Sequence, residues 1–157
     1  MGANESLHLT FREARESDLP ALIDMLADDT LGAQREDSSR PVNPSYTSAF
    51  HGIDADPNNE LVVVVADEAL VGMLQLTFIP YLSHTGSWRC LIESVRIARP
   101  FRGYGLGSRL FQWAIDRARA RNCQLVQLTS DKQRPDAIRF YESLGFVASH
   151  EGLKLSL

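Results

Sequence analysis

The chain has no long hydrophobic run, and this absence argues against one class of protein. The longest uninterrupted apolar stretch covers only Leu61 to Ala66, whereas a membrane-spanning helix needs about 20 apolar residues. The N-terminus also lacks a basic region followed by a long apolar stretch, so no secretory signal is expected. We therefore expect a protein that does not act at a membrane.

Cysteine and net positive charge are also scarce. The two cysteines, Cys90 and Cys123, form no C-x-x-C pair and show no metal-site spacing with histidine. Isolated thiols are typical of a reduced, cytoplasmic protein, and no metal is predicted. The 16 Lys and Arg against 20 Asp and Glu leave a formal net charge of -4, which disfavours binding to nucleic-acid phosphates.

The remaining composition is that of an ordinary globular protein. The chain has 157 residues, of which 44% are hydrophobic and 23% charged, close to the usual size and balance of one domain. No repeat or low-complexity linker interrupts the sequence. Residues 1–157 are therefore predicted to form a single domain.

Apolar residues at every second position, or in continuous short runs, predict four strands before residue 100. Residues 7–13 alternate apolar with polar side chains, which indicates a half-buried strand. Three β-rich runs follow at 61–66, 69–79 and 88–97. The connections between them suit antiparallel neighbours, so a meander is expected.

Helical periodicity separates these strands from the rest of the chain. Ser17 is predicted to cap a first helix, and a short helix is expected over 45–53. A longer amphipathic helix spans 105–121. The last helix is predicted to begin at Pro135 and to stop at Gly145.

The element order predicts a mixed α/β (α+β) fold. A short strand is expected over 125–128, and the apolar residues at 146–147 and 153–157 predict one or two strands at the C-terminus. The result is a central, mixed but mostly antiparallel sheet of six to seven strands with about four flanking helices.

A glycine-rich loop lies between the predicted strand 88–97 and the long helix. It reads Arg102-Gly103-Tyr104-Gly105-Leu106-Gly107-Ser108. Glycines let backbone N–H groups approach a ligand, and the N-terminus of the helix adds free donors and partial positive charge. The loop predicts a phosphate site, and the alternative is a tight strand-to-helix turn without a ligand.

The spacing in this loop argues against two common phosphate motifs. Ser108 stands where the dinucleotide fingerprint has its third glycine. The loop also contains no lysine, which the nucleotide P-loop requires. NAD and ATP are therefore not the predicted ligands.

Three segments together resemble the GNAT superfamily of N-acetyltransferases. These are the acyl-CoA pyrophosphate motif R/Q-x-x-G-x-G/A at Arg102-x-x-Gly105-x-Gly107, the fourth strand at Leu91–Ile97, and A-x-x-F-Y-x-x-x-G-F at Ala137–Phe146. The likeness is strong over 90–147. Arg134 departs from the pattern, because many relatives carry Asn there, although an arginine could contact a phosphate instead.

The resemblance implies a GNAT-like fold with acetyl-CoA as cosubstrate. In that fold the fourth and fifth strands splay apart, here near Val95–Ile97 and Gln127–Thr129, and expose backbone groups to the pantetheine arm and the thioester. The Val95 N–H is the expected oxyanion donor. The implied cofactor-binding residues are Val95, Arg96, Ile97, Arg102, Gly103, Tyr104, Gly105, Leu106, Gly107, Ser108, Arg134, Phe140 and Tyr141.

Glu93 is the predicted general base that takes a proton from the incoming amine. In plain alternation it shares a strand face with Val95 and Ile97, and a carboxylate on an apolar face is expected to have a raised pKa. The alternative is a salt-bridged Glu at the sheet edge, and a bulge near Ser94 would break this alternation.

Tyr141 is the predicted general acid. A phenol with a pKa near 10 can protonate a departing thiolate, and the resemblance places this tyrosine beside the cofactor sulfur. The alternative is a tyrosine of the hydrophobic core. His84 and His150 are rival bases.

The predicted activity is transfer of an acetyl group from acetyl-CoA to a primary amine by direct attack in a ternary complex. The alternative is a non-catalytic domain that binds or senses acyl-CoA. The acceptor is a small molecule or a peptide, and acidic residues such as Asp28, Asp29, Glu36 and Asp37 hint at a cationic amine. A homodimer is the expected assembly.

Overall fold

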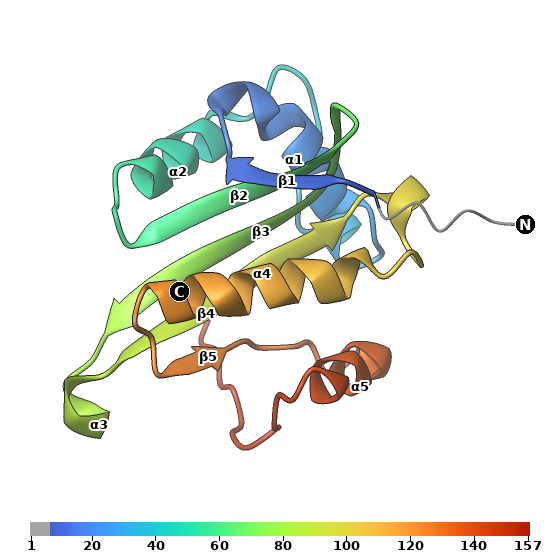
Figure 1. Ribbon diagram of the computed structural model, residues 1–157. Coiled ribbons are helices and arrows are strands. Elements are labelled where there is room, and N and C mark those ends of the chain that lie inside the picture. The colour runs from blue at the N-terminus through green and yellow to red at the C-terminus, as the bar shows by residue number, and fades with distance from the viewer. Residues whose placement is uncertain (1–6) are drawn as a thin grey trace, which may run out of the picture.

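A computed structural model describes residues 7–157 and has one sheet at its centre (Figure 1). Its five strands lie in the order β1-β2-β3-β4-β5. Their bounds are β1 Leu9–Glu13, β2 Asn59–Ala66, β3 Ala69–Pro80, β4 Trp88–Ile97 and β5 Leu125–Gln127. The first four are antiparallel neighbours, and β5 pairs parallel with β4. The predicted antiparallel meander and the mixed sheet are confirmed.

Helices cover both faces of this sheet. They are α1 Leu19–Ala27, α2 Pro44–Asp54, the single turn α3 Ser83–Gly86, α4 Leu106–Ala120 and α5 Pro135–Ser143. Helices α1 and α2 lie on one face and α4 lies on the other, with α5 beyond β5 (Figure 1). Within residues 7–157, none of the helices has the length and apolar character that crossing a bilayer requires.

Two expectations about these elements were wrong. Residues 7–157 contain five strands rather than six to seven, because 146–147 and 153–157 form no strand. Alternating apolar residues form a strand only where a neighbour pairs with their backbone groups, and none does so here. Helix α1 begins at Leu19 behind Asp18, whereas Ser17 lies within a 3-10 turn.

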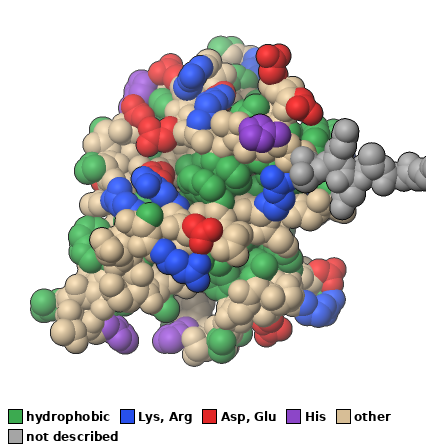
Figure 2. All heavy atoms as spheres, viewed as in Figure 1, with side chains coloured by type: hydrophobic (Ala, Val, Ile, Leu, Met, Phe, Trp, Pro, Cys, Tyr) green, Lys and Arg blue, Asp and Glu red, His purple; other side chains and the backbone are tan. Residues whose placement is uncertain are grey.

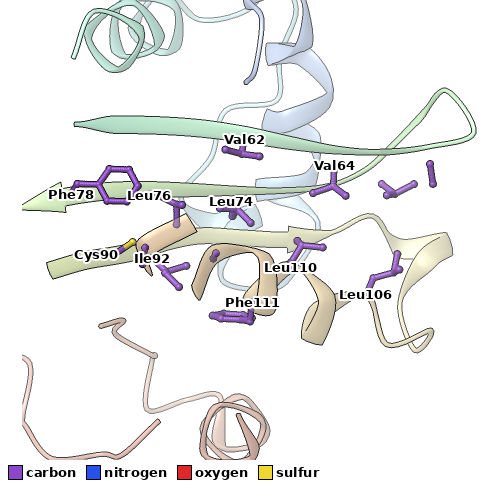
Figure 3. Packing of buried hydrophobic residues seen from close by; sticks show 14 residues of the cluster. Val62, Val64, Leu74, Leu76, Phe78, Cys90, Ile92, Leu106, Leu110 and Phe111 are labelled. Carbon is purple, nitrogen blue, oxygen red and sulfur yellow. The ribbon is translucent and has the colours of Figure 1, made fainter. Parts of the chain in front are cut away.

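Two apolar layers explain the composition of β2. Val62 and Val64 pack with α4, whereas Val63 packs with α1 and α2 on the opposite face. Figure 3 shows the first layer, in which Leu110 of α4 faces the sheet residues. A strand buried on both faces is continuously apolar rather than alternating, as this one is.

The edge of the sheet is closed against α4 by aromatic stacking. The ring of Phe11 in β1 stacks on Trp113 in α4 with centroids 4.7 Å apart. Figure 2 shows hydrophobic side chains gathered between β1 and α4, with charges of both signs around them. This contact joins the first strand to the helix that follows the glycine loop.

A buried ion pair joins α4 to the start of β2. The Glu60 side chain is only 7% exposed, and it accepts a hydrogen bond of 2.9 Å from Arg117 Nε. Arg121 Nη1 lies 3.7 Å from the same carboxylate. A carboxylate this buried is costly without its partners, so Arg117 contributes to the docking of α4.

Replacing Arg117 with Met is expected to lower the free energy of unfolding by about 2–4 kcal/mol, because the buried carboxylate loses its bidentate partner. Arg119→Met on the same helix is the matched control, since Arg119 pairs with an exposed Asp116, and its cost is expected to stay within about 0.5 kcal/mol. Urea denaturation measures both changes. Equal losses for the two variants would contradict a special role for Arg117.

Candidate active site

Strands β4 and β5 separate after three residue pairs. The last of these pairs joins Leu91 to Gln127, but β4 continues to Ile97. From Ile92 onward, the edge of β4 that faced β5 is therefore unpaired within residues 7–157. Backbone N–H and C=O groups on such an edge are open to a ligand. This is the splay that was expected near Val95–Ile97.

A β-bulge interrupts β4 at the point where it leaves β5. Ser94 has a φ of 55°, a left-handed conformation that is uncommon for residues other than glycine. The register pairs Glu93 with Gln75 and Arg96 with Met73. One extra residue therefore stands in β4, and neither Ser94 nor its successor has a partner in β3.

The bulge changes which side chains share a face. Val95 and Ile97 pack into the cluster beneath α4, whereas the cross-strand partner of Arg96 belongs to the cluster of α1 and α2. Glu93 and Arg96 therefore point away from α4. The expectation that Glu93 shares an apolar face with Val95 and Ile97 was wrong, and its carboxylate is exposed.

The glycine loop owes its shape to positive φ angles. Gly103 and Gly105 have φ values of 83° and 75°, which residues with a Cβ rarely adopt. Gly105 is the N-cap of α4. The first N–H groups of the helix, beginning at Leu106, therefore have no intrahelical acceptor and present partial positive charge, which suits a pyrophosphate.

Gly107 serves a different purpose, because it lets α5 approach α4. A Cβ at Gly107 would lie 3.3 Å from Cζ of Phe140, tighter than an ordinary van der Waals contact. Phe111 of α4 contacts Phe140 and Tyr141 of α5 edge-on, with ring centroids 5.7 and 5.4 Å apart. The first turns of α4 therefore position Tyr141.

The Tyr141 phenol is half-buried and stays protonated well into the alkaline range. Burial raises its pKa above the ordinary value near 10, and the positive charges of Arg134 and Arg96 oppose this shift. Both expected roles of Tyr141 are compatible with this position, since the ring packs in an aromatic cluster while the charges of two arginines act on the phenol.

Acidic residues after α1 bind arginines of the site. Asp28 accepts hydrogen bonds from Arg99 and, at 3.0 Å, from Arg102. The hydrogen bond from Arg99 holds the pKa of Asp28 below its usual range. Asp29 pairs with Arg134 at 2.7 Å. Asp28 and Asp29, two of the four acidic residues that hinted at a cationic acceptor, are therefore paired with arginines of this chain.

Most of the expected cofactor residues lie around the free edge of β4. The loop from Arg102 to Ser108 follows β4 directly and begins α4, and Tyr104 in it is 73% exposed. Arg134 is the N-cap of α5. Arg96 is the exception, because its side chain points to the other face of the sheet, so only its backbone lies on the edge.

Comparisons with known proteins agree with this arrangement. The model of the acetyltransferase (GNAT) family matches residues 19–146. The chain belongs to this family. It is therefore an N-acetyltransferase that uses acetyl-CoA as its cosubstrate. The family's fold accounts for the splayed strands and for the glycine loop at the N-terminus of α4.

Three relatives illustrate the similarity. The aminoalkylphosphonate N-acetyltransferase of Salmonella typhimurium is 34% identical over 106 residues, which is 68% of each chain. A transcriptional regulator from Bacillus halodurans C-125 is 57% identical over 96% of this chain and 100% of its own, with a TM-score of 0.92. An acetyltransferase of Trypanosoma brucei is 25% identical over 96% and 100%, with a TM-score of 0.75.

Asp28 and Asp29 are the site residues whose partners the sequence did not indicate. They lie 74 and 105 positions from Arg102 and Arg134, so no local spacing connects them. The only signal was the acidic run itself, which is usually a solvated surface.

Ser108→Glu tests the loop without harming the fold. Ser108 is the third residue of α4, where a glutamate interacts favourably with the helix dipole and stabilises the helix. The negative charge of this glutamate would, however, repel the cofactor pyrophosphate. We expect the Kd for CoA to rise about tenfold or more, while the melting temperature is unchanged or higher. Calorimetric titration measures the affinity, and Ser108→Gln is the neutral control. Equal affinities for the two variants would show that the pyrophosphate binds elsewhere.

Proposed function

We propose that the protein transfers the acetyl group to a primary amine by direct attack in a ternary complex, with Glu93 as general base and Tyr141 as general acid. The observation that carries this proposal is the convergence of three features. The β4 edge is free of β5 beyond Leu91, α4 begins with free N–H groups after its N-cap Gly105, and the Tyr141 ring packs on Phe111 of α4.

The amine attacks the thioester carbonyl after Glu93 accepts its proton through a water molecule. The exposure of Glu93 favours this relay over direct contact. The Val95 N–H is available because Val95 has no partner in the β3 register, and it donates to the oxyanion. The carbon–sulfur bond then breaks, Tyr141 gives its proton to the CoA thiolate, and the remaining extra proton of the attacking nitrogen leaves through solvent and restores the Tyr141 phenol.

The names of two relatives bear differently on the acceptor. The Salmonella relative is named for aminoalkylphosphonates, which supports a small primary amine as the substrate. The Bacillus relative is named a transcriptional regulator, a name that gives no acceptor. Release of free thiol from acetyl-CoA with a panel of amines tests acetyl transfer to a small amine.

Glu93→Gln is expected to lower kcat/KM by about 10²-fold at neutral pH, because the ammonium must lose its proton before it attacks. The loss should shrink as the pH rises towards the pKa of the amine, where the amine arrives neutral. Initial rates measured across the pH range with one good acceptor follow this recovery.

Tyr141→Phe is expected to lower kcat with little change in the affinity for acetyl-CoA, since only the hydroxyl is removed. Its loss should not shrink at high pH, because a neutral amine does not replace a missing acid. In the wild type, burial raises the pKa of the Tyr141 phenol, which favours the protonated form of this acid. Parallel pH profiles for the two variants would contradict these separate roles.

We also propose a cytoplasmic homodimer. Cys90 and Cys123 are free thiols, which supports a reducing compartment. β5 is an edge strand of the sheet. Leu153, Leu155 and Leu157 alternate along the C-terminal segment and are at least 86% exposed, so they can cover a second copy of the chain.

Leu155→Asp tests this assembly, because a charge in the exposed apolar row would oppose its burial between two copies. Light scattering is expected to give a dimer for the wild type and a monomer for the variant, and Ser156→Asp is the adjacent control. A monomeric wild type would overturn the homodimer and leave the catalytic proposal intact.

A further inference from the structure

Arg96 is a half-buried cation without a carboxylate partner in hydrogen-bond distance among residues 7–157. Its Nη1 donates to the neighbouring carbonyl of Val95 at 2.9 Å, and its Nε is buried with no partner at all. Burial lowers the pKa of this guanidinium, and Asp29 opposes the shift. A buried guanidinium is costly unless its N–H groups are satisfied, so the site is suited to an added acceptor group.

The charged group to which Arg96 belongs has three arginines, Arg96 included, against two carboxylates. Arg134 and Arg35 add positive charge, and Asp29 and Glu36 add negative charge. Both carboxylates have other partners, because Asp29 accepts from Arg134 at 2.7 Å and from the Gly32 N–H at 2.6 Å. Glu36 accepts from the Tyr46 hydroxyl at 2.8 Å. Neither carboxylate hydrogen-bonds to Arg96.

Arg96 is close in the strand to one predicted catalytic group, and its charge acts on the other. It follows Glu93 on the same face of β4, on the other side of the bulge at Ser94. Its charge acts on the Tyr141 phenol together with that of Arg134. A group bound by Arg96 would therefore lie next to the place where the amine meets the thioester, and away from the pyrophosphate loop at the N-terminus of α4.

We propose that Arg96, with Arg134 beside it, binds an acidic group of the acceptor, so that the substrate is a small primary amine carrying a phosphonate or carboxylate a few bonds from its nitrogen. This inference rests on the proposed catalytic function of the same site. A planar guanidinium with free N–H groups is the side chain best suited to such oxyanions. The phosphonate or carboxylate bound by Arg96 holds the acceptor in place, and the amine of the acceptor then points towards Glu93.

The test is a matched set of acceptors. We would compare 2-aminoethylphosphonate and 3-aminopropanoate with ethanolamine, which is neutral apart from its amine, and with ethylenediamine, which is cationic. The wild type is expected to show a kcat/KM about 10- to 100-fold higher for the two acidic amines, as a charge-assisted hydrogen bond would give. The phosphonate and carboxylate arms show which oxyanion fits.

Arg96→Met should reduce this preference to about one, mainly by raising KM for the acidic amines. Arg96→Lys should restore part of it, because the charge returns without the planar fork. Arg139→Met is the surface control, since Arg139 is 70% exposed and pairs with Asp136, and it should keep the wild-type preference. Two results would overturn the proposal. One is a kcat/KM for the neutral or cationic amine that equals that for the acidic amines, and the other is a preference for the acidic amines that survives in Arg96→Met.

A binding measurement distinguishes this failure from failure of the catalytic proposal. Ethylphosphonate, which has no amine, would be titrated into the protein–CoA complex. We expect binding that weakens at least about tenfold in Arg96→Met, while the Kd for CoA changes less than about threefold. If no amine is acetylated but ethylphosphonate binds in this way, the catalytic function is wrong and the anion site stands. If ethylphosphonate has the same Kd for the wild type and for Arg96→Met, the anion site is excluded.

Discussion

The early end of the β4–β5 pairing is the constraint on which the site depends. Parallel neighbours need a crossover connection, and here this connection consists of the glycine loop and α4. The loop leaves β4 where its edge is already free of β5 beyond Leu91. Unpaired backbone on the strand and unpaired N–H groups on the helix thus lie along one continuous stretch of chain, as an extended acyl-CoA requires.

Helix α5 is held by aromatic packing rather than by the sheet. Phe111 makes edge-on contacts with Phe140, Tyr141 and Phe146, and the missing side chain of Gly107 allows the close approach of Phe140. Figure 3 shows Phe111 on the underside of α4, facing the region of α5. The predicted acid therefore depends on the same helix that begins at the cofactor loop.

The charges of the site are arranged by contacts between distant segments. Asp28 and Asp29 neutralise arginines of the loops before α4 and α5, whereas the half-buried Arg96 has no carboxylate partner in hydrogen-bond distance in the described part of the chain. An enzyme whose cofactor brings several negative charges can separate two anion sites in this way. The N–H groups of α4 suit the cofactor, while Arg96 suits the acceptor.

The sequence by itself determined the elements and the cofactor loop, whereas the tertiary structure decided the faces and the partners. Helical and β periodicity, the Gly105 turn and the A-x-x-F-Y segment are local properties, and the structure has them nearly where they were predicted. The bulge at Ser94 depends on the register with β3, so simple alternation misplaced Glu93. The C-terminal residues 153–157 have a strand pattern but no strand in residues 7–157 to pair with, because pairing is set by distant segments and not by local pattern.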